Sequence, residues 1–212
     1  MEVFEEFIEC LRSFSPGQVA VNARDLLRQN YNWPRLVRRF LASQDEDLFI
    51  RNVRTAHIPH VEPRVCMLHD EPDRFRVILH VFDLLQFRIY WNEGRMGPHF
   101  HHFSFSTRIL RGSYFNWLFK NNGALETPRL EFEQQQRCDA GTVYFISWDK
   151  YHCVLAPEDA TMSLMVRDRQ SYNPGERPDP NYTNDMILCT RDRMLRLLES
   201  APAEVSSRIL EI

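Results

Sequence analysis

The chain has no long hydrophobic run and no excess of positive charge. None of its apolar stretches approaches the roughly 20 residues that a membrane-spanning helix needs, and its opening, MEVFEEFIECLRSF, is acidic where a secretory signal is basic and then apolar. The 26 Lys and Arg against 29 Asp and Glu give a formal net charge of −3, so the protein has no overall positive field to attract the phosphate backbone of a nucleic acid. We therefore expect no membrane partner, no nucleic-acid partner and a cytoplasmic location.

Closely spaced cysteine pairs are also missing. The 5 cysteines are scattered and include no CxxC pair, which argues against a zinc ribbon or a redox dithiol and predicts reduced thiols. Hydrophobic residues make up 43% and charged residues 26% of the 212 positions, the balance of an ordinary globular protein. One domain over residues 1–212 is the expectation at this length.

The two ends of the chain have helical spacing. Residues 1–44 repeat apolar side chains at three- and four-residue intervals, with a break at residues 15–17 and an expected N-cap at Asn22. This predicts a helical cap of two or three short helices. Residues 169–212 begin with a Pro-rich passage, read as a covering loop, and continue with the helical pattern MILCTRDRMLRLLESA.

The middle of the chain, residues 47–168, has the pattern of short β-strands. Runs rich in β-branched and aromatic residues alternate with turn-forming clusters: LFIRNV, RVCMLH, FRVILHVFDLLQFRIYW, FSFSTRIL, YFNWLF, RLEFEQ, GTVYFISW, HCVLA and TMSLMVR. This predicts a mainly β sandwich or barrel between the terminal helices.

Three histidines crowd together in GPHFHH. In an extended strand His99 and His101 point to the same face while His102 points away, so His99 and His101 can bind one ion. A later strand pattern offers His152 as a third ligand. Imidazole suits Fe, Zn, Cu and Ni, and three neutral ligands leave coordination positions open for substrate, which indicates catalysis. The remaining histidines are expected to be packed or surface residues rather than ligands: His57, His60, His69 and His80.

Two segments resemble the motifs of the cupin superfamily. GPHFHHFSFSTRILRG resembles the first cupin motif, which has HxH, a Glu and a closing Gly, and AGTVYFISWDKYHCVLA resembles the second, with its single histidine. The resemblance implies a mainly β cupin jelly-roll barrel with N-terminal helices and a C-terminal helix. The motif's Glu falls near Phe105, beside Ser106, so the anionic ligand is missing, which is typical of the thiol dioxygenases with a three-histidine site.

The likeness to the cysteine dioxygenase family extends to LFIRN at 48–52 and IYWNEGRMGPHFHH. It implies that Arg51 lies on a strand and pairs with a substrate carboxylate, as a planar guanidinium can. It also implies that His99, His101 and His152 hold Fe(2+), and that both atoms of O2 are added to the thiolate sulfur of a small substrate to give a sulfinate.

Departures from that family concern the outer relay Ser-His-Tyr. Ser163 keeps the serine, but Met165 and Arg167 stand at the other two positions and relay no proton near neutral pH. Arg167 either brings a second positive charge into the cavity or faces outward as a surface residue. Other chemistry on a metal-dependent cupin, such as isomerase, decarboxylase or oxidase activity, and non-catalytic binding of a small ligand are the alternatives. Ni, Zn or Cu in place of iron, and a monomer or a homodimer, also stay open.

Overall fold

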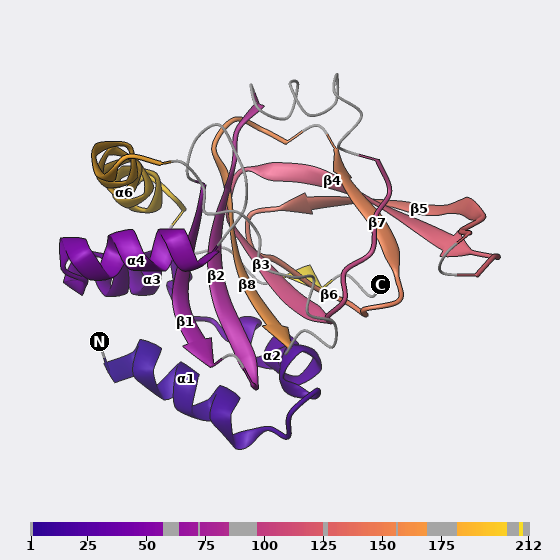
Figure 1. The fold of residues 1–212 in the computed structure, drawn as a ribbon, viewed down its shortest axis with the longest axis horizontal. Coiled ribbons are helices and arrows are strands. Elements are labelled where there is room, and N and C mark those ends of the chain that lie inside the picture. Colours follow the sequence, from indigo (N-terminus) through magenta and orange to yellow (C-terminus); the bar gives the residue numbers. More distant parts are fainter. Residues whose placement is uncertain are drawn as a thin grey trace.

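The structure is a computed structural model that describes residues 2–56, 64–71, 73–84, 97–124, 127–155, 157–168, 182–202 and 208–209. Within them, helices precede and follow a body of β-strands (Figure 1). The helices are α1 (Glu2–Ser13), α2 (Val19–Leu27), α3 (Trp33–Ser43), α4 (Glu46–Ala56) and α6 (Asn184–Glu199). The helices predicted at both ends are therefore confirmed. No helix in these ranges is both long and apolar enough to cross a bilayer.

The strands form two sheets whose neighbours are far apart in the sequence. Their bounds are β1 (Val65–Glu71), β2 (Phe75–Phe82), β3 (Phe105–Arg111), β4 (Ser113–Asn121), β5 (Leu130–Asp139), β6 (Thr142–Ile146), β7 (Tyr151–Leu155), β8 (Thr161–Asp168) and β9 (Arg208–Ile209). One sheet has the order β1-β2-β8-β3-β6-β9 and the other β5-β4-β7. Strand β8 runs antiparallel between β2 and β3, which precede it by many residues. This is a jelly-roll arrangement, as the resemblance to the cupin motifs implied.

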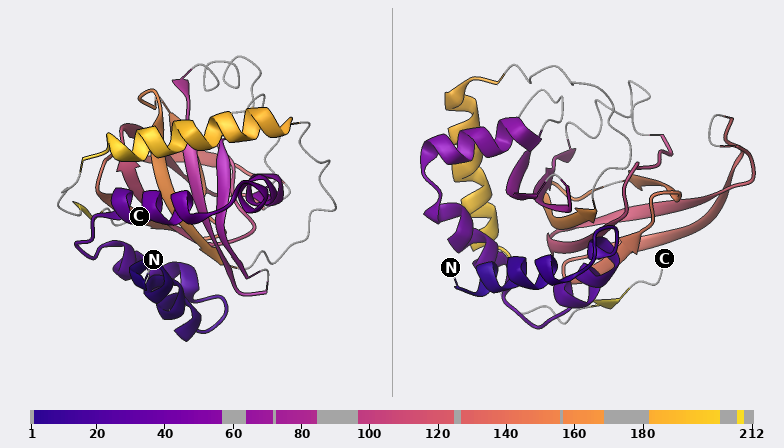
Figure 2. Two further views of the ribbon diagram at one scale, coloured as in Figure 1. Left: turned by 90° about the vertical axis from the view of Figure 1, so that its left-hand side faces the viewer. Right: turned by 60° about the horizontal axis from the view of Figure 1, so that its bottom comes forward.

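The larger sheet separates two hydrophobic cores. Side chains alternate along a strand, so Val77 and Leu79 of β2 pack toward the helices while Ile78 and His80 point into the barrel. Figure 2 shows the helices lying across one face of this sheet. The second core, around Phe105 and Tyr144, fills the space between the sheets.

Helix α2 is held at both ends by the barrel. Its first turn has no side-chain cap of its own; instead the buried Asp168 carboxylate at the end of β8 accepts a hydrogen bond from the Ala20 backbone N–H at 2.9 Å. The Arg108 guanidinium donates to the carbonyl of Leu27 at 2.6 Å, at the negative end of the helix. The expected N-cap at Asn22 is wrong, because that residue lies within the helix.

Replacing Asp168 with alanine is expected to destabilise the protein by about 1–2 kcal/mol, the usual cost of losing an N-cap. Burial raises the pKa of this carboxyl group although backbone N–H groups of Ala20 and Val19 oppose the shift. The neutral Asp168→Asn variant keeps an acceptor, and we expect it to retain most of the stability. Urea unfolding followed by circular dichroism checks both, and equal losses in the two variants would show that the cap contributes nothing.

The strand predicted at residues 48–52 is wrong. These residues lie in α4, whose first turn is capped by Asp45 Oδ1, which accepts from the Leu48 N–H at 2.7 Å. Phe49 and Val53, four residues apart, are the buried positions, which is the spacing of a helix rather than of a strand. The helical region thus extends to Ala56 and the first strand begins at Val65.

The C-terminal helix is confirmed as α6. The Thr183 hydroxyl caps it by accepting from the Met186 N–H at 3.2 Å. The covering loop predicted before it lies mostly at 169–181, outside the described residues.

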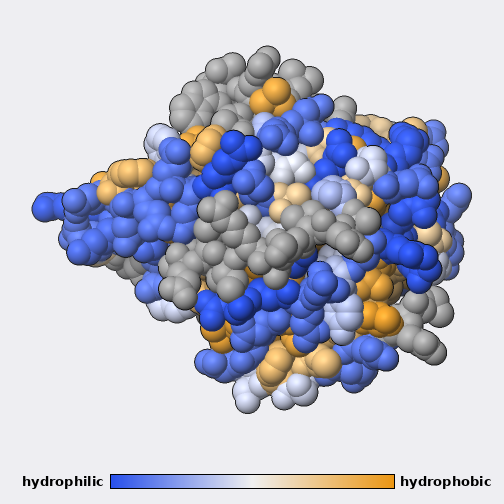
Figure 3. All heavy atoms as spheres, turned by 180° about the vertical axis from the view of Figure 1, so that it is seen from behind, coloured by the Kyte–Doolittle hydropathy of each residue, from blue (hydrophilic) through white to orange (hydrophobic). Residues whose placement is uncertain are grey.

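The face of the molecule seen from behind is mainly hydrophilic where it is coloured (Figure 3). In the view from behind (Figure 3) apolar residues gather in small groups between polar ones. Among the described residues, the large exposed apolar side chains are single residues on different segments: Tyr31, Phe132, Trp148 and Met186. Scattered residues of this kind need no partner to explain them.

Candidate metal centre

His99 and His152 are joined through their backbones. The His99 N–H donates to the carbonyl of His152 at 2.9 Å, and the His152 N–H donates back to the carbonyl of His99 at 2.9 Å. This isolated antiparallel bridge ties the segment before β3 to β7. His101 lies two residues after His99, and its ring contacts the rings of both His99 and His152. The predicted grouping of His99, His101 and His152, called here the histidine triad, is therefore confirmed as a geometric cluster.

The triad nitrogens are spaced for one divalent metal ion. The ligand atoms of the triad all lie within 4.8 Å of one another. His101 Nε2 and His152 Nε2 are 3.0 Å apart. Two nitrogens bound at right angles to one ion, each at about 2.1 Å, are separated by about 3.0 Å, so His101 and His152 are spaced to share one ion. His99 Nδ1 lies 3.1 Å from the Gly97 carbonyl, a contact that leaves His99 Nε2 for the ion.

The remaining histidines in the described ranges stay outside this cluster. His102 contacts the Phe100 ring at 4.9 Å on the opposite face, as the alternation predicted. His69 pairs with Glu71 at 2.9 Å, and His80 packs on Phe82 at 4.0 Å. His57 and His60 lie outside the described residues. Among the residues that the structure describes, the triad is the only group of His, Cys, Asp or Glu spaced to hold an ion.

Burial keeps two of the triad rings neutral. Desolvation by burial lowers the pKa of His101 to about 3, assisted by the charges of His99 and Arg167. Desolvation, and then the charges of His99 and His101, also lower the pKa of His152 well below its usual value. A metal ligand must offer a lone pair, so these neutral rings are ready to bind without first losing a proton. His99 is exposed and His152 is buried, which places the cluster at the mouth of the barrel.

The metal-free protein is expected to lose stability as the pH falls from about 6.5 toward 3. An unfolded histidine takes up a proton near pH 6.5, while folded His101 stays neutral down to about 3, so the unfolded state binds more protons across this window. The free energy of unfolding should fall by up to about 1.4 kcal/mol per pH unit for each such histidine. Urea unfolding at several pH values, with chelator present, measures the slope. His101→Asn should flatten it; an unchanged slope would contradict the assignment.

Phe105, which falls near the Glu of the motif that this segment resembles, lies beside the triad. Its ring centroid is 5.1 Å from that of His101 and 5.7 Å from that of His152. Ser106 points to the other side of β3 and donates to the carbonyl of Ala20 at 2.6 Å. An aromatic ring therefore occupies this position beside the triad, and within the described residues the donor set is three imidazoles.

Arg167 points into the barrel beside the triad rather than outward. Its neighbours Leu164 and Val166 face the helix-side core, and alternation turns Arg167 to the interior, where its side chain is 8% exposed. The guanidinium carbon lies 4.3 Å from the centroid of the Phe103 ring, which is 5.0 Å from the His101 ring. Of the two predicted placements, the structure shows the inward one and not the outward surface one.

The other predicted catalytic residues do not reach the triad. Ser163 is buried on the same face of β8 but four residues from Arg167, or about 13 Å along the strand. Arg51 is exposed on α4, which packs against β1 and α6 on the helix side of the larger sheet. That placement does not fit a role in binding a substrate at the barrel mouth.

One residue of the site was missed. Asn116 of β4 is fully buried, and its Oδ1 lies 3.0 Å from Nδ1 of His152. The available signal was a polar residue on the inward face of YFNWLF, between the apolar Tyr114 and Leu118. Polar residues at such positions are hydrogen-bonded or functional.

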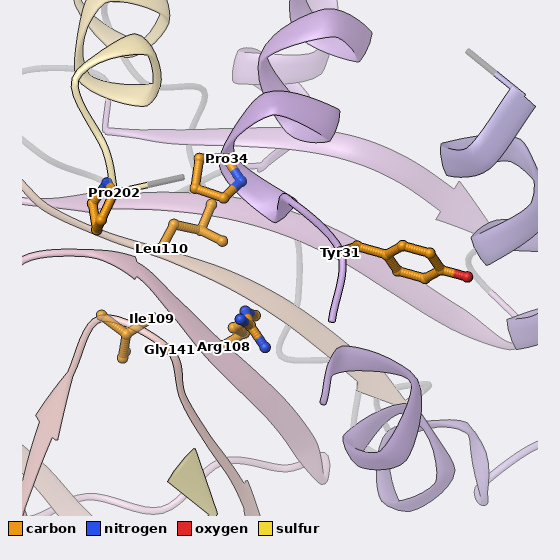
Figure 4. Close-up of a pocket in the computed structure, with 7 residues that line it drawn as sticks. All are labelled: Tyr31, Pro34, Arg108, Ile109, Leu110, Gly141 and Pro202. Atoms are coloured by element: carbon orange, nitrogen blue, oxygen red, sulfur yellow. The ribbon is translucent and has the colours of Figure 1, made fainter. Parts of the chain in front are cut away.

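A small hollow lies elsewhere, between the start of α3, strand β3 and the segment after α6 (Figure 4). Its lining residues are Tyr31, Pro34, Arg108, Ile109, Leu110, Gly141 and Pro202. It contains no member of the triad and so is distinct from the metal centre.

No protein-family profile matches the chain, and no curated protein matches it. Among solved structures, KdgF from Halomonas sp. is similar at 15% identity with a TM-score of 0.34, covering 55% of this chain and 91% of that one. A tryptophan-to-phenylalanine variant of Bacillus subtilis oxalate decarboxylase is similar at 11% identity and TM-score 0.40, covering 75% of this chain and 41% of that one. A cupin superfamily protein from Desulfitobacterium hafniense is similar at 14% identity and TM-score 0.33, covering 53% and 84%.

Proposed function

We propose that the protein is a non-haem iron(II) dioxygenase that uses O2 to oxidise a small thiol or a related metal-chelating carboxylate. The observation that carries the proposal is the histidine triad with Phe105 where an acidic ligand would stand. Three neutral ligands leave the double charge of the ion uncompensated, which favours an anionic substrate that binds the ion directly.

The residues of the site have different roles in this proposal. His99, His101 and His152 hold the ion. Iron, when bound, supplies open coordination positions and the redox chemistry by which O2 oxidises a coordinated thiolate. Phe105 and Phe103 pack against the His101 ring and limit water around it. Arg167, held over Phe103, is placed to receive a carboxylate on its planar fork.

Arg167 takes the role that the sequence assigned to Arg51. A bidentate guanidinium–carboxylate pair is a charge-assisted hydrogen bond, worth about 1.5–3 kcal/mol where it is shielded from water. A substrate with a carboxylate at one end and a thiolate at the other satisfies both the arginine and the ion. Met165 has no exchangeable proton and Arg167 does not release its proton near neutral pH, so we assign no proton relay to β8.

Oxygen uptake by the iron-loaded protein tests the proposal. We expect uptake with cysteine and 3-mercaptopropionate and slower uptake with cysteamine, which has no carboxylate. Arg167→Leu should lower kcat/KM for the carboxylate thiols about 10- to 100-fold and leave cysteamine nearly unchanged. Arg137→Leu, at an exposed arginine of β5, is the matched control. Iron-loaded protein that consumes no oxygen with any thiol would refute the dioxygenase.

A second candidate is a metal-dependent enzyme acting on a carboxylate without sulfur. The placement of Arg167 favours it, since an arginine beside the triad recognises a carboxylate whatever the substrate's other end. Iron binding without thiol-dependent oxygen uptake, together with protection of the site by simple carboxylates, would select this candidate.

We place the activity in the cytoplasm. All five cysteines are free thiols, as the scattered spacing predicted. Ferrous iron and a free thiol substrate both persist under the reducing conditions of that compartment.

A further inference from the structure

Asn116 has a buried carboxamide whose oxygen contacts His152 and whose nitrogen has no hydrogen-bond partner. It lies on the inward face of β4 with 0% exposure, and its Oδ1 lies 3.0 Å from Nδ1 of His152. Its Nδ2 has no hydrogen-bond partner. A buried donor without a partner costs about 1–3 kcal/mol, so this arrangement is not explained by stability.

The contact with His152 decides which ring nitrogen carries the proton. A neutral imidazole has one N–H, on Nδ1 or on Nε2. The Asn116 oxygen only accepts, so the contact requires the proton on Nδ1 and leaves a lone pair on Nε2. That atom is the one 3.0 Å from His101 Nε2, on the side where an ion is bound.

The opposite orientation of the amide has the opposite effect. If Nδ2 pointed at His152 Nδ1, it would donate to an unprotonated nitrogen, and the proton would move to Nε2, where it blocks a metal. The amide orientation and the competence of His152 as a ligand are therefore coupled.

From this geometry we propose that Asn116 is a positioning residue, which holds His152 in the tautomer that binds metal at the expense of an unpaired Nδ2. The backbone supports the arrangement. Leu118, two residues along β4, lies opposite His152 in the ladder, and the His99 bridge fixes His152 from its other side. The ring is thus held by its backbone on both sides and by its Nδ1. The proposal rests on the proposed metal site but not on dioxygenase chemistry.

Zinc affinity of three variants tests the proposal. Zn²⁺ avoids redox chemistry and is titrated in competition with a chromophoric chelator. Asn116→Leu removes the acceptor at similar volume and should weaken binding about 10- to 100-fold, the usual effect of losing an outer partner of a metal ligand. Asn116→Asp keeps an acceptor and should stay within a few-fold of wild type. Thr107→Val, also buried on the barrel side of β3, changes a polar group away from the triad and should have no effect.

The tautomer in the metal-free wild type is a second measurement, which needs no variant at Asn116 to fold. Nitrogen NMR of histidine-labelled protein, with His152→Gln to identify the signals, should show His152 protonated at Nδ1 and neutral at pH 7. Protonation at Nε2 would overturn the proposal. So would equal losses of affinity in Asn116→Leu and Thr107→Val. If the wild type binds no metal, the metal site fails, and the NMR result still decides the role of Asn116.

Discussion

Replacing His152 with alanine is expected to abolish stoichiometric metal binding. The ring is 4% exposed, its Nε2 faces His101 Nε2, and its Nδ1 is engaged by Asn116. No other described side chain is placed to supply the lost nitrogen. Since losing an outer partner alone costs 10- to 100-fold in affinity, losing the ligand should cost more than about 100-fold. Elemental analysis after purification with added iron, and chelator competition with Zn²⁺, measure the effect.

The surrounding histidines provide the controls. His99→Ala and His101→Ala should behave like His152→Ala, because each removes one of the three nitrogens. His102→Ala lies on the opposite face of the same segment and should bind metal like wild type. Metal retained in all of these variants would rule out the triad. Metal lost in His102→Ala as well would indicate collapse of the segment instead.

The triad could be predicted because its signals are short-range. His99 and His101 are two residues apart, and alternation in an extended chain is enough to put them on one face. His152 needed only the assumption that a later strand lies beside that segment, which the backbone bridge to His99 fulfils. Phe105 was indicated by the resemblance to the first cupin motif, whose Glu falls near it, and in the structure its ring lies beside those of His101 and His152.

The positions of Arg51 and Arg167 could not be predicted from the sequence, because they depend on competing patterns. LFIRNV contains enough apolar and β-branched residues for a strand, but in α4 the cap at Asp45 and the buried pair Phe49 and Val53 favour a helix. Arg51 then faces solvent. For Arg167 the sequence left inside and outside equally open, and in the structure both faces of β8 are buried.

Asn116 illustrates a different limit. Its role depends on a contact with His152 across two strands, 36 positions apart in the sequence. Alternation places Asn116 on the inward face, but only the register of β4 against β7 brings it to His152 rather than to another polar group.

Replacing Phe105 with glutamate is expected to convert the three-histidine centre into one with an acidic ligand. The new carboxylate starts from a position whose ring now contacts both His101 and His152. Without metal, the variant loses a buried aromatic ring and buries a carboxyl group, which should cost about 3–5 kcal/mol. With metal, the carboxylate binds the ion, so much of that loss should be recovered, and the preference should shift toward Mn²⁺.

Thermal unfolding with and without metal measures this gain. One kcal/mol corresponds to about 2–4 °C for a chain of this size, so the metal-dependent rise in Tm should exceed that of Phe105→Gln by several degrees. Phe105→Gln is the matched control, because glutamine has the same shape as glutamate but carries no charge. The glutamate also fills a coordination position that the proposed substrates need, so oxygen uptake should fall in Phe105→Glu more than in Phe105→Gln. Equal metal affinities in the two variants would show that position 105 does not face the ion, and would remove the basis for reading Phe105 as the replacement of an acidic ligand.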